Sequence, residues 1–367
     1  MYNISANSPR KENIMTAKLS PDTLKLLEDV ENRIDPQTED DFRSQWRDFL
    51  FDRFDGDIFT PVRKKCTPQS ASIITVDNIN DALDDYDLML RHQLQGVSAA
   101  LNGTRANICV RANYGTGILS SVFGADIFYM PRETNTLPTT RSVNDTEWIR
   151  QKVLQGIPDI MSGFGRKVFE FGELCAETFE KYPKIKKYVN VYHPDLQGPL
   201  DICELLWGGE IFYAMYDEPE LIHDMLDLVT NTYIRFMDKW HAVFPRDDEM
   251  NPHWSNLWHR GAIMLRNDSA MNLSPDFYRE FALPYDTKLL KKYGGAMHFC
   301  GRGDHYIEAL CSINWLYGIN MSQPHLNDMQ TIYKNTVDRG IKLLGFKKQP
   351  AQEHLSRPGG FYHNLNV

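Results

Sequence analysis

Short apolar runs that alternate with helical stretches constrain the fold of this chain more than any other feature of its sequence. Six runs are short, apolar and often β-branched, which is typical of strands: 108–114, 188–193, 262–266, 296–300, 317–322 and 341–346. Helical patterns separate the later runs, at 201–216, 219–244, 274–293 and 328–339. The last four strand–helix units recur every 20 to 35 residues or so, a spacing typical of parallel strands joined by crossover helices.

A closed α/β barrel has eight strands, and the sequence shows six clear ones. The less distinct segments 72–76 and 253–258 are the candidates for the remaining two. With them, the sequence predicts an α/β fold, a (β/α)8 TIM barrel with an N-terminal helical extension. An open, doubly wound sheet is the alternative, although no Gly-x-Gly-x-x-Gly motif follows any early strand.

The beginning of the chain has a different character. Residues 1–20 are polar and predict a flexible arm, and Ser20-Pro21-Asp22 then reads as an N-cap followed by proline at the first helical position. Further helices are expected at about 40–53 and 78–101. The predicted organisation is therefore an arm at 1–20, a helical cap at 21–105 and the barrel at 106–367.

Composition excludes several classes of function. The net charge of −9 argues against binding nucleic acid through a basic face. No segment approaches the roughly 18 apolar residues that cross a membrane, and the N-terminus lacks an apolar signal core. The six cysteines are dispersed, as expected of reduced thiols. We expect a cytoplasmic protein without a membrane or nucleic-acid partner, and a homodimer is left open.

His298 and Cys300 are the candidate metal ligands. They occupy alternate positions of one short strand, so their side chains point to the same face near the strand's carboxyl end, where barrel enzymes build their sites. Imidazole and thiolate are both good zinc ligands. The alternative is that both side chains pack in a barrel interior. His325, just past the next strand, is the positional candidate for a third ligand; Glu353, His354 and His363 follow the last strand.

Other polar residues follow predicted strands and are candidates for the same site. Asp195 and Asp268 are predicted as catalytic residues that act as acid, base or orienting group, and a turn or capping role is the alternative for each.

Substrate-binding candidates complete this set. They are the polar residues that end or follow strands, namely Arg111, Asn113, Tyr114, Gln197, Arg266 and Arg302. Arg302 has a simpler alternative, an ion pair with the nearby Asp304.

Several segments together resemble the uroporphyrinogen decarboxylase superfamily, and within it the cobalamin-dependent methyltransferase-like branch. The resemblance runs over about 108–346 and rests on the order and spacing of DLQGP (195–199), YDEPE (216–220), NDSA (267–270), LSPDFYREF (273–281), LPY (283–285) and HFCG (298–301). It implies a TIM barrel whose site lies in a cleft at the carboxyl ends of the strands.

The resemblance also distinguishes two branches. The decarboxylases carry an early Arg-Gln-Ala-Gly-Arg segment that binds the substrate's carboxylates, and here the nearest basic stretch, TPVRKK (60–65), does not match it. The methyltransferases hold zinc with His-x-Cys and a later cysteine. His298 and Cys300 match the first two ligands, whereas no cysteine follows Cys311.

For this branch the resemblance implies a zinc ion that keeps a small thiol substrate as its thiolate, and a corrinoid methyl donor carried by a partner protein. Two alternatives stay open. The first is a metal-independent decarboxylase or related lyase in which Asp195 or Asp268 stabilises a protonated intermediate. The second is a barrel that binds a corrinoid or tetrapyrrole without turnover.

Overall fold

The computed structural model of the chain describes residues 19–69, 78–245, 249–347, 350–353 and 364–367. Its strands are β1 (Ile58–Phe59), β2 (Cys109–Val110), β3 (Ile127–Phe128), β4 (Thr139–Thr140), β5 (Asn190–Val191), β6 (Met250–His253), β7 (Leu257–Arg260), β8 (Ile263–Arg266), β9 (Gly295–Phe299), β10 (Leu316–Met321), β11 (Lys342–Leu343) and β12 (Leu365–Asn366).

The α-helices are α1 (Pro21–Arg33), α2 (Pro36–Leu50), α3 (Tyr86–Asn102), α4 (Ile118–Val122), α5 (Thr146–Gln155), α6 (Gly163–Phe179), α7 (Pro183–Tyr188), α8 (Pro199–Trp207), α9 (Glu210–Asp217), α10 (Pro219–Val243), α11 (Pro275–Phe281), α12 (Leu283–Tyr293), α13 (Ile307–Leu310) and α14 (Met329–Asn335). Short 3₁₀ helices include η3 (Ser269–Asn272), η4 (Pro324–Leu326) and η5 (Val337–Arg339).

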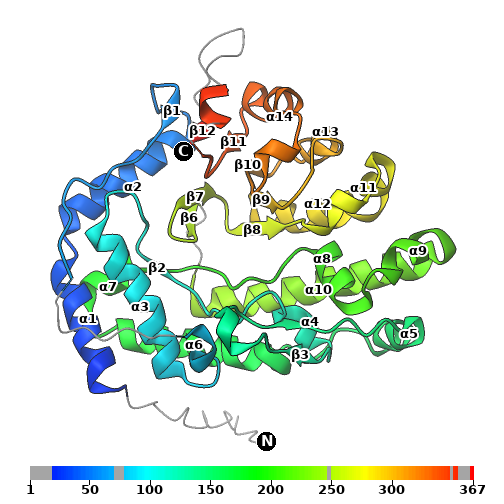
Figure 1. Cartoon of the computed structure of the whole chain (residues 1–367), viewed down its shortest axis with the longest axis horizontal. Helices are drawn as coiled ribbons and strands as arrows, with labels where there is room; N and C mark the ends of the chain where they lie inside the picture. The colour runs from blue at the N-terminus through cyan, green and yellow to red at the C-terminus, as the bar shows by residue number, and fades with distance from the viewer. Residues whose placement is uncertain (1–18, 70–77, 246–248, 348–349, 354–363) are drawn as a thin grey trace, which may run out of the picture.

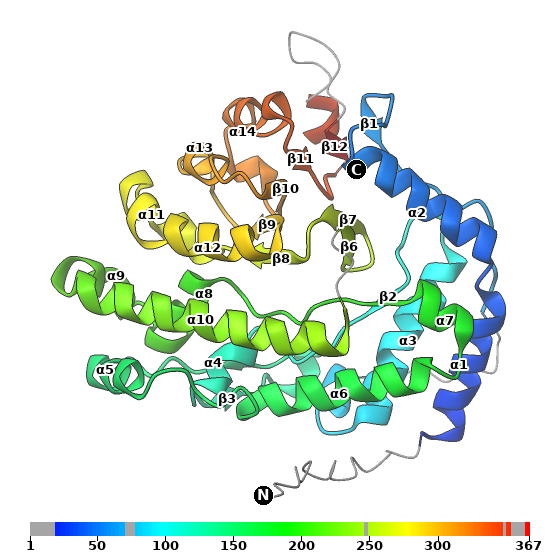
Figure 2. The same ribbon diagram turned by 180° about the vertical axis from the view of Figure 1, so that it is seen from behind.

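The main sheet has six strands in the order β1-β12-β11-β10-β9-β8, and every neighbouring pair in it is parallel. The strands predicted at 262–266, 296–300, 317–322 and 341–346 are thus confirmed as consecutive neighbours. Those predicted at 108–114 and 188–193 are shorter; they form a separate parallel pair, β2 and β5. Figures 1 and 2 show helices α8 to α14 arranged outside these strands.

Backbone pairing does not close a barrel within the residues that the structure describes, so the predicted (β/α)8 barrel is only partly formed. Between β5 and β8 a side chain takes the place of strand pairing: the backbone N–H of Met264 donates to His193 Nε2 at 2.9 Å. The strand expected at 72–76 lies outside the described residues. The prediction for 253–258 was wrong, because β6 and β7 form an antiparallel hairpin whose turn begins at Trp254, with φ of +50°.

This hairpin occupies the space that a closed barrel would enclose, and α2 packs against it from the outer edge of the molecule. One apolar cluster joins α2, the hairpin and the inner faces of the central strands: Phe42, Trp46, Phe49, Leu50, Phe59, Met250, Leu257, Trp258, Met264, Ala296 and Leu344. In both overall views the hairpin lies in the middle of the molecule, between α2 and β8 (Figures 1 and 2). Met264 and Ala296 are each two positions before a polar residue of the candidate site, so this cluster forms the floor beneath that site.

The N-terminal helices pack onto the same molecule. Ser20 Oγ accepts a hydrogen bond from Thr23 N at 3.3 Å, which confirms the predicted N-cap of α1. Helices α1 and α3 pack against each other, and their buried residues join the large apolar core that also contains α6 and α10. In the part of the chain described, no helix has the length and apolarity needed to cross a membrane.

Candidate metal centre

The candidate centre lies where three neighbouring strands of the main sheet end. Strand register places Arg266 of β8 beside His298 of β9, and His298 beside Asn320 of β10. Cys300 follows β9 directly, and Asp268 follows β8 by two positions. Because parallel strands end at the same edge of a sheet, these side chains reach the same region from separate loops.

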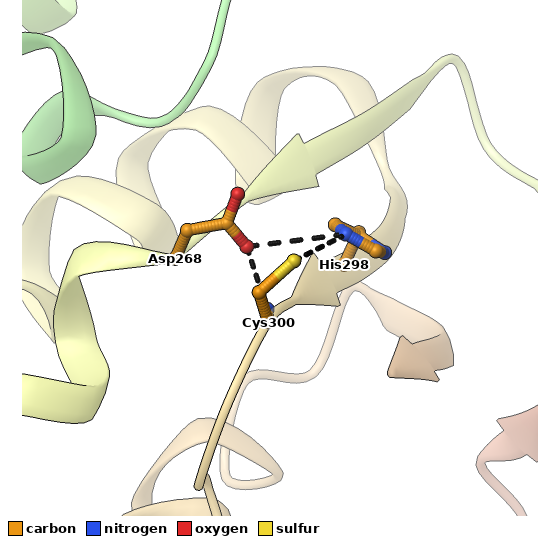
Figure 3. Close-up of side chains that lie close together, drawn as sticks. All are labelled: Asp268, His298 and Cys300. Atoms are coloured by element: carbon orange, nitrogen blue, oxygen red, sulfur yellow. Dashed lines mark hydrogen bonds and ion pairs between the residues drawn. The ribbon is translucent and has the colours of Figure 1, made fainter. Parts of the chain in front are cut away.

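Asp268, His298 and Cys300 bring three ligand atoms within 4.8 Å of one another (Figure 3). Cys300 Sγ lies 3.5 Å from His298 Nε2, and Asp268 Oδ1 lies 3.9 Å from the same nitrogen. The backbone N–H of Cys300 donates to Asp268 Oδ1 at 2.6 Å, which fixes the carboxylate against the end of β9. The prediction that His298 and Cys300 share one face therefore agrees with the geometry.

These distances fit a zinc ion. With bonds of about 2.0 Å to nitrogen and about 2.3 Å to sulfur, two ligands of a tetrahedral zinc lie roughly 3.5 Å apart. The separation of Cys300 Sγ and His298 Nε2 has that value, whereas Asp268 Oδ1, at 3.9 Å from the same nitrogen, would have to move closer on binding zinc. Without metal, the same arrangement is a thiol that donates a weak hydrogen bond to an imidazole. The donor set matches zinc chemistry, with one nitrogen, one sulfur and one oxygen.

Asn320 determines which nitrogen of His298 faces this group. The Asn320 amide donates to the carbonyl oxygen of Leu344 at 2.6 Å, so its Oδ1 must be an acceptor. That oxygen lies 2.6 Å from His298 Nδ1, which therefore carries the ring proton and donates it. Nε2 is left with its lone pair toward Cys300 and Asp268. A hydrogen bond of this kind is how proteins orient histidine ligands.

The electrostatic environment keeps both residues neutral before a metal binds. Burial, and then the positive charge of Arg266, lowers the pKa of His298, so the imidazole is a free base with an available lone pair. Burial raises the pKa of the Cys300 thiol, although a hydrogen bond to Ser322 at 3.4 Å acts in the opposite direction. Binding of a metal here would therefore displace the thiol proton.

Two glycines shape the loops around the centre. Gly301 has φ of +74°, and a Cβ there would lie 2.5 Å from Met271 Sδ, so the chain can turn away directly after Cys300. Gly198 follows β5, and a Cβ there would lie 2.0 Å from the carbonyl oxygen of Arg266. The glycine thus lets the loop at 195–198 cross the end of β8 at close range.

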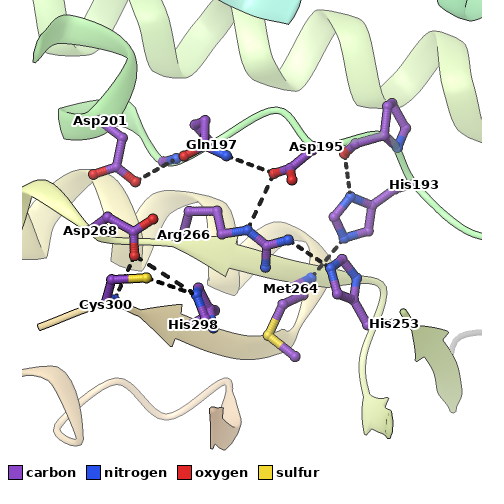
Figure 4. Close-up of polar contacts among 12 residues, drawn as sticks. His193, Asp195, Gln197, Asp201, His253, Met264, Arg266, Asp268, His298 and Cys300 are labelled. Carbon is purple, nitrogen blue, oxygen red and sulfur yellow. Dashed lines mark hydrogen bonds and ion pairs between the residues drawn. The ribbon is translucent and has the colours of Figure 1, made fainter. Parts of the chain in front are cut away.

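A buried charge cluster adjoins the centre (Figure 4). Asp195 accepts hydrogen bonds from Arg266 Nε and Arg111 Nη1, both at 3.2 Å, and from Gln197 at 2.7 Å. Burial alone would raise the pKa of Asp195, but the two guanidinium groups hold it at about 2. The carboxylate is therefore permanently charged and its oxygens are occupied, which suits an orienting role better than proton transfer.

Arg266 has more donors than this cluster uses. Its second terminal nitrogen lies 2.8 Å from His253 Nε2, and the guanidinium stacks 4.6 Å from the centre of the Trp254 ring. Its Nη1 is buried and has no partner among the described residues. Arg266 is 3% exposed, so this is an unused donor of a buried cation.

The remaining predicted residues are placed as follows. Asn113 is buried and accepts two hydrogen bonds from Arg111 through Oδ1. Tyr114 is fully buried and packs against Phe164, with ring centres 5.5 Å apart, so it belongs to the core. Arg302 is exposed and pairs with Asp304 at 2.6 Å. The structure therefore does not bring Tyr114 or Arg302 to the centre.

His325 is the main difference in the predicted ligand set. It is exposed on η4 and lines a cavity of about 600 Å³ together with Ser322 and Asp328, outside the group of three ligand atoms. Asp268 takes the third position instead.

Sequence reasoning missed two residues of β10 and its end, Asn320 and Ser322, which contact His298 and Cys300. Their alternate spacing on one predicted strand was the available signal.

A second cavity, of about 540 Å³, opens on the other side of Asp268. Several polar side chains line it, among them Thr116, Ser142, Gln197, Asp201 and Glu204. Asp201 caps the start of α8 and accepts a hydrogen bond from Ser269 N at 2.7 Å. Burial, and then the nearby charge of Asp268, raises its pKa to about 6. The cavity gives a small molecule access to the carboxylate of the candidate centre.

Comparison with known proteins agrees with the fold. No family model matches the sequence, and no curated protein is detectably similar to it. Among solved structures, a methyltransferase from Methanosarcina mazei superposes with a TM-score of 0.58 at 14% sequence identity, over 89% of this chain and 91% of that one. At this identity the similarity shows the architecture alone: over nearly its whole length, this chain has the α/β fold of that methyltransferase.

Proposed function

We propose that this chain is a methyltransferase that binds zinc through Asp268, His298 and Cys300 and methylates a small thiol. One observation carries the proposal. Nitrogen, sulfur and oxygen donors from two adjacent strand ends lie within 4.8 Å of one another, at the end of the sheet where barrel-like enzymes assemble their sites. The name of the structural neighbour, a methyltransferase, and the resemblance of the sequence to corrinoid-dependent methyltransferases support the reaction class.

The three side chains suit a catalytic rather than a purely structural zinc. Structural sites are closed by four protein ligands, whereas catalytic sites have three and leave one position for substrate. Among the described residues the group has three members. A zinc ion held there would keep a bound thiol in its thiolate form at neutral pH, which is the form that accepts a methyl group.

The residues around the zinc ligands have separate tasks in this proposal. Asn320 holds His298 with Nε2 toward the substrate side, and the Cys300 N–H holds Asp268 in place. Arg266 supplies a buried donor without a partner, which would bind a carboxylate or other acidic group of the substrate. Asp195, Arg111 and Gln197 keep that arginine in position.

The methyl donor in this proposal is a corrinoid on a partner protein. In the proposed methyl transfer, the thiolate sulfur forms a bond to the methyl carbon, and the bond between that carbon and the donor's cobalt breaks. The electron pair of that bond stays on the cobalt, which is reduced from Co(III) to Co(I). The thiol proton passes to solvent. The choice of a corrinoid rests on the resemblance of the sequence alone, and the name of the structural neighbour supports methyl transfer only.

A carboxy-lyase that uses Asp195 receives less support. Two arginines already compensate the negative charge of Asp195, so little of that charge is left to stabilise a protonated intermediate. A barrel that only binds a tetrapyrrole or corrinoid would not need a group of three metal donors at its mouth.

Metal content tests the proposal first. Protein stripped with a chelator and then supplied with zinc should retain about one equivalent after desalting, and Cys300→Ala should retain much less. Cys66→Ala is the matched control, because Cys66 is a free, exposed cysteine outside the group and should leave zinc content unchanged. Full zinc binding by Cys300→Ala would contradict the metal site.

Activity tests the reaction. With methylcobalamin and a small thiol that carries a carboxylate or sulfonate, the zinc-loaded protein should produce the methyl thioether together with Co(I), which absorbance detects. The stripped protein should lose the activity and regain it with zinc. Turnover that is unaffected by stripping would refute zinc-assisted thiol activation while leaving the fold assignment intact.

A further inference from the structure

A separate polar cavity lies at the end of the main sheet opposite to the candidate metal centre. It has a volume of about 310 Å³ and is lined by the amino-terminal ends of β10 and β11, the end of α2 and the last residue of β7. The candidate metal centre lies at the carboxyl ends of β8, β9 and β10. The two sites are therefore separated by the length of the strands, and the carboxyl end of α2 lies near β12 on this side (Figures 1 and 2).

The cavity is strongly basic in a protein whose net charge is −9. Three basic side chains line it, Arg260, Arg339 and Lys342, against a single acidic one, Asp52. Lys342 and Asp52 pair with each other at 2.6 Å. Neither arginine has a side-chain hydrogen bond or ion pair with another residue of the described ranges. Among the described residues, these two positive charges of the cavity have no acidic partner.

Arg260 is held in a way that leaves its donors free. The centre of its guanidinium lies 4.4 Å from the centre of the Tyr317 ring and 5.0 Å from that of Phe51. Aromatic rings contact the face of a guanidinium, whereas its N–H groups point outward from the edge. The two rings therefore restrict the side chain without using its hydrogen-bond donors. A restricted arginine loses less conformational freedom on binding an anion than a mobile one.

We propose that this cavity binds the phosphate group of a small metabolite, with Arg260 and Arg339 as its principal contacts. A planar guanidinium can donate two parallel hydrogen bonds to a phosphate, whereas the buried charge of Lys342 is already paired with Asp52. Ser312 and Asn314 line the same cavity and supply neutral polar groups. The volume admits a phosphate with a small organic part. The site is independent of the metal centre and of the proposed methyl transfer.

Calorimetric titration in a phosphate-free buffer tests the proposal, with inorganic phosphate and glycerol 3-phosphate as the probes. At least one probe should bind the full-length protein, and Arg260→Gln and Arg339→Gln should each weaken that binding about tenfold or more. Arg53→Gln is the matched control, because Arg53 is exposed, pairs with Asp48 and does not line the cavity. Tighter binding of the ester than of inorganic phosphate identifies a phosphorylated metabolite; the reverse identifies the free ion.

A variant with the opposite expected effect on phosphate binding makes the test sharper. Asp52→Asn removes the only acidic group of the cavity lining and releases Lys342, so it should strengthen binding by a few fold. Zinc content at the metal centre should stay unchanged in all of these variants. Absence of binding by both probes at about 10 mM, or equal affinity in wild type, Arg260→Gln and Arg339→Gln, would overturn the proposal. Because Arg339 is exposed, its variant should fold even if Arg260→Gln does not.

Discussion

Replacement of Asn320 by alanine should weaken zinc binding without touching any proposed zinc ligand. Asn320 is 6% exposed and joins His298 Nδ1 to the Leu344 carbonyl through two hydrogen bonds of 2.6 Å. Its removal leaves His298 free to rotate or to move its proton to Nε2, where it would block a metal. Outer hydrogen-bond partners of metal ligands typically contribute about 10- to 100-fold to affinity.

The same change should also destabilise the fold. Alanine leaves one buried acceptor and one buried donor without a partner, and each such group costs roughly 1–3 kcal/mol. We expect the free energy of unfolding of the metal-free protein to fall by about 2–6 kcal/mol. Zinc affinity is measured by competition with a chromogenic chelator, and stability is measured by urea unfolding at pH 7.5.

Asn320→Asp separates the two effects. An aspartate keeps an acceptor for His298 Nδ1 but loses the donor to Leu344, so zinc affinity should largely return while stability stays low. Asn335→Ala is the control, because Asn335 makes its hydrogen bond within α14, to Thr331. Zinc affinity in Asn320→Ala that equals the wild-type value, in a protein that still folds, would refute the orientation of His298 inferred here.

Three further predictions follow from separate features of the structure. Gly301→Ala should destabilise the protein by about 1–3 kcal/mol, because residue 301 has φ of +74° and a Cβ there would contact Met271. Gly96→Ala, on the exposed side of α3 with open space around it, should instead stabilise the protein by about 0.5–1 kcal/mol. Equal melting temperatures for the two variants would contradict this prediction. Asp268→Asn keeps an acceptor for the Cys300 N–H but loses the charge, so zinc affinity should fall less than in Cys300→Ala, and an unchanged affinity would remove Asp268 from the ligand set. Burial lowers the pKa of His193 to about 3 and that of His259 to about 4 from 6.5, so both take up protons on unfolding below pH 6.5. Stability should therefore be full above about pH 6.5 and fall toward pH 5 by up to about 1.4 kcal/mol per pH unit for each histidine, and a flat urea-unfolding profile between pH 7 and pH 5 would contradict it.

The sequence predicted the central part of the fold and the two main ligands because both depend on short-range periodicity. The strands β8, β9 and β10 are apolar, four to six residues long and followed by polar residues. Alternation within one such strand suffices to place His298 and Cys300 on the same face. Neither inference needed knowledge of distant contacts.

The third ligand could not be predicted in the same way. Asp268 and His325 both follow a strand that neighbours β9, so position along the chain does not distinguish them. The hydrogen bond from Cys300 N to Asp268 turns the first loop inward, while η4 carries His325 to the surface. The prediction that Tyr114 binds substrate was wrong for a related reason. Strand β2 ends at Val110, so the alternation of side chains along a strand no longer applies four residues later.

The hairpin formed by β6 and β7 was missed because a turn at Trp254 is unusual. Its φ of +50° is rare for a bulky residue, and the polar residues of the turn, Ser255 and Asn256, come only after it. The residues on both sides of the turn, 250–253 and 257–259, are mostly buried, so the segment resembles one continuous strand. The chain folds back there because both strands of the hairpin contribute side chains to the apolar cluster shared with α2 and the central strands, a contact between distant segments.

The pairing of β12 with β1 has a consequence for how the protein is made. Asn366 donates a hydrogen bond to the carbonyl oxygen of Phe59 across 307 positions, and β12 lies between β1 and β11 in the sheet. On the ribosome, β1 emerges long before its partner has been translated. Such distant pairing slows folding, and the aromatic side chains of α2 have to remain shielded in the meantime. We therefore expect the main sheet to be completed late in folding, when β12 takes its place between β1 and β11.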